Sequence, residues 1–132
     1  MRSSVLDSYA VLAYLFAERG HEKVVTLLEK AADSGKSVLI SAPNWAEVRY
    51  QVERKSGALR WTEIREKLLA LPVEVVPAGM ELAEAAGAIK ASRKMSLADC
   101  FAAALATDRR ADLYTGDPEF KAVEKEIRIV WI

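Results

Sequence analysis

The sequence has little cysteine, little histidine and no excess of charge, and each shortage excludes a class of protein. Cys100 is the single cysteine among 132 residues, so no internal disulfide can form and we expect a reducing, cytoplasmic environment. His21 is the single histidine, which argues against Ser-His-Asp catalysis. The formal net charge is +0, so the basic excess common in nucleic-acid-binding proteins is missing.

The sequence also lacks long apolar runs and glycine-rich loops. No apolar stretch approaches the roughly 20 residues that cross a bilayer. Residues 1–4 are not followed by the long apolar segment of a signal peptide, so we expect no membrane attachment. No glycine-rich phosphate loop follows a predicted strand, which argues against nucleotide binding of the Rossmann or Walker kind.

The chain instead alternates short apolar runs with amphipathic stretches, in a composition that is 52% hydrophobic. Its length predicts one core in a single domain, residues 1–132. Strands alternating with helices predict a three-layer α/β/α sandwich with a central, mainly parallel five-stranded sheet. Strands are expected at residues 4–7, 38–40, 73–76, 112–115 and 128–131. Helices are expected at residues 9–19, 21–34, 44–55, 60–71, 81–92 and 96–108, with a short helical turn opening at 116–118.

Asp7 ends the first apolar run and stands just before a predicted helix. A run that is apolar throughout indicates a strand buried on both faces, in the middle of a parallel sheet. Open α/β sheets bind ligands at the carboxyl ends of such strands. The alternative is that Asp7 is only the N-cap of the following helix, and for this residue alone the two interpretations have equal weight.

Three further acids are candidates, and each also has a structural alternative. Glu47 follows the second strand on a helix and faces away from its apolar stripe, as an ordinary solvated residue also would. Asp99 lies in the first turn of its helix, at capping-box spacing from Ser96. Asp117 precedes Pro118, which is typical of an N-cap.

We expect these four carboxylates to meet at one edge of the sheet. Asp7, Glu47 and Asp117 each follow a predicted strand, and a helix that carries Asp99 back along the sheet begins at the same edge. Two charges about 5 Å apart repel by roughly 3 kcal/mol at an effective dielectric near 20, so such acids take up protons or bind a cation. Oxygen ligands without a histidine or cysteine cluster select Mg²⁺ or Mn²⁺, and magnesium held in this way suits phosphate substrates.

Two hydroxyl groups are expected at the same edge. Ser8 follows Asp7, and Thr115 ends the fourth predicted strand. As accessory groups they would orient a bound water or a ligand carboxylate. Local turn hydrogen bonds explain both hydroxyls equally well.

The ordered set of these motifs resembles a PIN domain, over essentially the whole chain. The length and compactness of the chain resemble the toxin of a VapBC-type toxin–antitoxin pair. Tyr9 departs from the pattern, because many relatives have a small polar residue there, and it would alter the substrate rim. The matching segments are Val5-Leu6-Asp7-Ser8, Ser41…Glu47-Val48, Ser96-Leu97-Ala98-Asp99 and Thr115-Gly116-Asp117-Pro118-Glu119-Phe120.

The resemblance implies a sheet order of 3-2-1-4-5 and the activity of a Mg²⁺- or Mn²⁺-dependent endoribonuclease. By the same resemblance, Asp7, Glu47, Asp99 and Asp117 would be the catalytic metal ligands, with Thr115 as an accessory group. The toxin comparison also implies a homodimer and inhibition by a cognate antitoxin lying near the active groove.

The hypothesis is therefore hydrolysis of RNA phosphodiesters by metal-activated water, with the cation supplying positive charge at the scissile phosphate. One alternative is a non-catalytic protein-interaction module, whose acids are helix caps and whose apolar helices near Trp45 and Trp61 form a partner surface. A metal-dependent DNA nuclease or phosphatase at the same site is a further alternative.

Overall fold

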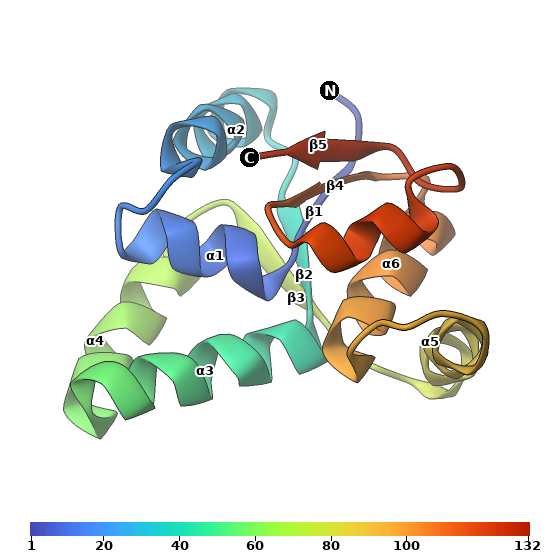
Figure 1. The fold of residues 1–132 in the computed structure, drawn as a ribbon. Coiled ribbons are helices and arrows are strands. Elements are labelled where there is room, and N and C mark those ends of the chain that lie inside the picture. Colours follow the sequence, from blue (N-terminus) through green and yellow to red (C-terminus); the bar gives the residue numbers. More distant parts are fainter.

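A five-stranded sheet forms the middle layer of the computed structural model, which describes residues 1–132 (Figure 1). All of its strand pairs are parallel, and their order is β3-β2-β1-β4-β5. The predicted fold class and the strand order implied by the resemblance are both confirmed. The strands are β1 (Ser4–Leu6), β2 (Val38–Ser41), β3 (Val73–Val76), β4 (Asp112–Thr115) and β5 (Ile129–Trp131).

Helices cover both faces of the sheet, because consecutive strand residues point to opposite sides. In β1, Val5 packs into a core with α5, α6 and η1, whereas Leu6 packs into a second core with α1 to α4. Figure 1 shows these two groups of helices on either side of the strands. The helices are α1 (Ser8–Leu15), α2 (His21–Ser34), α3 (Ala42–Ser56), α4 (Ala58–Leu69), α5 (Met80–Ser92), α6 (Leu97–Arg109) and the 3₁₀ helix η1 (Pro118–Val123).

The first helix is shorter than predicted: it was expected at residues 9–19 and spans Ser8–Leu15. It ends at Leu15, and Ala17 follows with a φ of 51°. The N–H of Glu18 then donates to the carbonyl of Ala13 at 2.9 Å, which is the bond of a Schellman motif. Glycine usually occupies the left-handed position of that motif, so an alanine there gave no signal in the sequence.

The parallel topology brings four chain segments to the carboxyl edge of the sheet. The elements α1, α3 and η1 each begin within three residues of the end of β1, β2 or β4. Helix α6 leads into β4 from this edge, so its N-terminus also lies there. No helix combines the length and apolar character needed to cross a membrane.

Candidate metal centre

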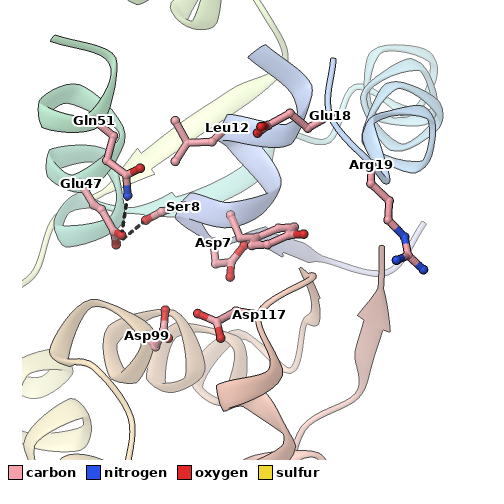
Figure 2. A pocket seen from close by; sticks show the side chains of 10 residues that line it. Asp7, Ser8, Leu12, Glu18, Arg19, Glu47, Gln51, Asp99 and Asp117 are labelled. Atoms are coloured by element: carbon pink, nitrogen blue, oxygen red, sulfur yellow. Dashed lines mark hydrogen bonds between the residues drawn. The ribbon is translucent and has the colours of Figure 1, made fainter. Parts of the chain in front are cut away.

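The four predicted carboxylates line one cleft of about 520 Å³ at the carboxyl edge of the sheet (Figure 2). Asp7 follows β1, Glu47 projects from α3, Asp99 lies in the first turn of α6, and Asp117 follows β4. Figure 2 shows Asp99 and Asp117 on one side of the cleft, facing Asp7. The structure therefore brings together side chains that are up to 110 residues apart in the chain.

Asp7 is both the N-cap of α1 and part of the cleft wall. Its Oδ1 accepts a hydrogen bond from the N–H of Ala10 at 2.8 Å, and its Oδ2 accepts one from the hydroxyl of Thr115. The residue is 1% exposed. Burial raises the pKa of this carboxyl to about 7; the two hydrogen bonds oppose the rise, and the charges of Asp117 and Glu47 add to it.

Thr115 joins two of the acids at the carboxyl edge of the sheet, where the sequence places it. While its hydroxyl donates to Asp7, its Oγ1 accepts the N–H of Asp117 at 3.0 Å. The side chain of Asp117 in turn accepts the N–H of Glu119 at 2.9 Å and caps η1. The cap interpretation and the cleft interpretation thus hold together for both Asp7 and Asp117.

Glu47 is held toward the cleft by two donors. The hydroxyl of Ser8 donates to its Oε1 at 2.9 Å, and the side-chain amide of Gln51 donates to its Oε2 at 3.0 Å (Figure 2). Asn44, which is fully buried, donates to the Ser8 hydroxyl at 3.0 Å. Asn44 was not among the predicted site residues, because nothing in its sequence spacing shows a bond to a residue 36 positions earlier.

Asp99 has the spacing of a capping box but makes only half of one. The Ser96 hydroxyl accepts the N–H of Asp99 at 3.3 Å, as in that motif. The reciprocal donor, the N–H of Ser96, bonds instead to Oε1 of Glu119 at 2.8 Å. Because Glu119 takes that N–H, the carboxylate of Asp99 stays free of the helix terminus.

The free carboxylate of Asp99 is the least satisfied polar group of the site. Asp99 is 6% exposed, and its buried Oδ2 has no hydrogen-bond partner. The pKa of this carboxyl is raised to about 8, first by burial and then by the charges of Asp117 and Asp7. Buried charges are normally paired or bound to metals, so this carboxyl either holds a proton, as its raised pKa indicates, or binds a cation.

Glu119 is the acid that sequence reasoning missed. Carboxylate oxygens of Asp99, Asp117 and Glu119 lie within 4.8 Å of one another, a spacing that would hold a metal ion. Glu119 belongs to the Thr115–Phe120 segment that resembles the PIN domain, but its bond to Ser96 cannot be seen in the sequence. These donors are oxygens alone, so the residues present fit a hard divalent cation such as Mg²⁺ or Mn²⁺.

Residues 4–126 match the family model described as the PIN domain. The chain belongs to the PIN-domain family. No curated protein matches the sequence. The cleft is therefore a feature of a PIN domain, built at the edge where its parallel strands end.

Solved structures of low sequence identity share this PIN-domain fold. One is DNA-bound VapBC from Salmonella typhimurium, 20% identical over 98% of both chains with a TM-score of 0.77. VapC20 of Mycobacterium tuberculosis, described as a sarcin–ricin loop cleaving toxin, is 18% identical over 98% of this chain and 100% of that one, with a TM-score of 0.73. FitAcB from Neisseria gonorrhoeae is 19% identical over 96% and 95%, with a TM-score of 0.68.

Proposed function

We propose that this PIN-domain protein is a Mg²⁺- or Mn²⁺-dependent endoribonuclease that acts as the toxin of a toxin–antitoxin pair. The observation that carries the proposal is the buried, unpartnered Oδ2 of Asp99, which faces other carboxylates in an open cleft. A structural carboxyl would be paired with a cation of the protein, whereas this one is left available for a ligand.

In this proposal Asp7, Glu47, Asp99 and Asp117 hold the cation, and Glu119 is a further candidate. A divalent cation bound there would neutralise charge on a phosphodiester and lower the pKa of a bound water. Thr115 fixes the orientation of Asp7 through its hydroxyl. Such supporting hydrogen bonds keep metal-binding carboxylates in one orientation, which favours tight binding.

Ser8 and Gln51 orient Glu47 on the other wall of the cleft, as Thr115 orients Asp7. They bond one oxygen each of Glu47, so that this flexible side chain is held before any ligand arrives. Prior fixation lowers the entropy lost on binding. The two walls then present their carboxylates to one volume, where a phosphodiester with a divalent cation would be accommodated.

The comparisons support the choice of substrate and partner. VapC20 is described as cleaving the sarcin–ricin loop, and other chains of this fold come from VapBC or toxin–antitoxin complexes. By analogy the substrate is RNA, and the protein partner is a cognate antitoxin that blocks the cleft. The proposal includes a homodimer acting in the cytoplasm.

The test is cleavage of a mixed RNA pool by the purified protein, with Mg²⁺ or Mn²⁺ and with EDTA as the metal-free control. We expect metal-dependent cleavage that Asp7→Asn abolishes, while Asp112→Asn, which alters a buried acid outside the cleft, retains it. A protein that cuts only DNA, or that cuts RNA equally well in EDTA, would contradict the proposal. The ends of the products would also define any site preference.

A further inference from the structure

The cleft contains an aromatic side chain that the proposed chemistry does not use. Tyr9 lies two residues after Asp7, lines the cleft and is 40% exposed. Of the ten residues that line the cleft, only Tyr9 and Leu12 are apolar. A large ring kept partly in solvent among carboxylates adds little to the core, so its position calls for another explanation.

The backbone at Gly116 is shaped around this ring. A Cβ added to Gly116 would overlap Cε1 of the Tyr9 ring and lie 2.6 Å from its Cζ. Gly116 has no positive φ, so what a side chain here would disturb is the Tyr9 ring and not the backbone conformation. Tyr9 therefore rests against the segment that joins Thr115 to Asp117, and its position is tied to that of the metal-binding carboxylates.

The charge of the cleft determines what can approach the ring. A phosphate is repelled by the surrounding acids except where a cation neutralises them. A nucleobase is uncharged and aromatic, and unpaired bases are commonly bound by stacking on exposed tyrosine, phenylalanine or tryptophan rings. One side of the ring rests against Gly116, and the exposed part of the ring is available for such stacking.

We propose that Tyr9 is a stacking platform for an unpaired base of single-stranded RNA, in the nucleotide next to the scissile phosphate. The inference rests on the ribonuclease function proposed above. The ring and the carboxylates share one cleft, so the stacked base and the cleaved bond belong to neighbouring nucleotides. Because the contact is with the face of the base and not its edge, it selects for an unpaired nucleotide without selecting one base.

The test uses short single-stranded RNAs in which an abasic site replaces one nucleotide at a time. For the wild-type protein, an abasic site at one position beside the cleavage site should lower kcat/KM by roughly 5- to 150-fold, the range for stacking of a single base. Tyr9→Ala should lower kcat/KM on intact RNA by a similar factor. On the RNA with that abasic site, Tyr9→Ala should cause no further loss.

The chain offers matched variants for this experiment. Tyr50→Ala removes a tyrosine that is 44% exposed on α3 and outside the cleft, and it should follow the wild type. Tyr9→Leu keeps apolar bulk without an aromatic face and should behave as Tyr9→Ala does. Gly116→Ala should displace the ring and lower kcat/KM, but should have no further effect in a Tyr9→Ala background.

Two results would overturn the inference while leaving the ribonuclease intact. The first is that the Tyr9→Ala protein is as active as the Tyr50→Ala protein. The second is that Tyr9→Ala lowers kcat/KM on the abasic RNA by the same factor as on intact RNA, because a general loss of folded protein would have that effect. If the wild-type protein shows no metal-dependent cleavage of the intact RNAs, the proposed function falls and the stacking platform falls with it.

Discussion

A buried carboxylate at the amino edge of the sheet is paired with arginine side chains, whereas one at the carboxyl edge is not. At the amino edge, Asp112 is 7% exposed, and Nε of Arg2 donates to its Oδ1 at 2.8 Å, with Nε of Arg128 3.8 Å from the same oxygen. At the carboxyl edge, Asp99 is equally buried, yet its Oδ2 has no partner at all. The protein supplies cations to one buried acid and leaves the other without any.

The difference supports the proposal that Asp112 is structural and that Asp99 is kept for a ligand. Five acids line the cleft, and Arg19 is the only basic residue among the residues that line it. A structural role would favour pairing, since an unpaired buried charge costs several kcal/mol. An acid retained without a partner reduces stability, and such a cost is typical of sites that bind or react.

The largest expected effect comes from Asp99→Asn, which removes the unpaired charge and keeps the shape of the side chain. Nuclease activity should fall by about 100-fold or more, because a ligand of the cation is lost. Without metal at about pH 8, the free energy of unfolding should rise by about 1–3 kcal/mol, since a desolvated carboxylate is neutralised. RNA cleavage and chemical denaturation in EDTA measure the two effects.

Asp99→Asn thus separates a metal site from a helix cap. The cap of α6 is the Ser96 side chain, so Asp99→Asn leaves it in place. If the Asp99→Asn protein kept full activity, or were less stable than the wild type in EDTA, the two edges of the sheet would not differ as described.

The next effect is the pH dependence of stability. The pKa values of Asp7 and Asp99 are raised from 3.8 to about 7 and about 8 in the folded protein. Between these values the folded protein holds protons that the unfolded chain has lost, so stability falls as pH rises. From about pH 5 to about pH 8, each group should cost about 2–4 kcal/mol in EDTA.

Saturating Mg²⁺ should abolish most of this pH dependence, because a bound cation stabilises the ionised carboxylates. Urea denaturation across the pH range, with EDTA or with Mg²⁺, gives the comparison. Asp99→Asn should show a shallower decline than the wild type. A metal-free protein whose stability does not change between these pH values would refute the origin assigned to the raised pKa values.

The parallel topology explains why much of the candidate site could be predicted. Asp7 and Asp117 follow strands directly, and Glu47 lies near the start of the helix after β2, so a parallel sheet with β1 between β2 and β4 brings the three to one cleft. Asp99 followed from the helix that leads into β4. These placements depend on the order of elements along the chain, which hydrophobic periodicity shows well, and on the spatial order of the strands, which only the PIN-domain resemblance implied.

The remaining features depend on contacts between distant side chains. Glu119 reaches Ser96 across 23 residues and Asn44 reaches Ser8 across 36, and neither bond leaves a pattern in the sequence. The early end of α1 depends on Ala17 adopting a positive φ, which local propensity disfavours. Such details are decided by packing once the fold exists.

A smaller effect is expected from Glu119, which keeps the Asp99 carboxylate available. Glu119→Gln still accepts the N–H of Ser96 but loses a charge, and it should weaken Mg²⁺ binding about 10-fold. Glu119→Ala also frees that N–H, which Asp99 could then accept to complete a capping box, turning its carboxylate from the cleft. A loss nearer 100-fold is expected for this variant.

Calorimetric titration with Mg²⁺ measures both Glu119 variants, and Glu124→Gln is the matched control because Glu124 is an exposed acid just past the end of η1. If Glu119→Ala binds Mg²⁺ as tightly as Glu124→Gln does, Glu119 neither holds the cation nor positions Asp99. The geometry of α6 alone would then have to explain why the Asp99 carboxylate is unpaired.

The smallest effect should come from Asp112→Asn at the amino edge, and its direction is opposite to that of Asp99→Asn. The new amide can still accept a hydrogen bond from Arg2, and both arginines are more than half exposed, so solvent weakens the lost ion pair. The free energy of unfolding should fall by about 1 kcal/mol, with unchanged nuclease activity.

The loss of stability in Asp112→Asn should shrink in high salt, because exposed charges are screened. If Asp112→Asn instead stabilises the protein, or reduces cleavage as Asp99→Asn does, then pairing with arginine does not distinguish a structural carboxylate from one kept for a metal ion.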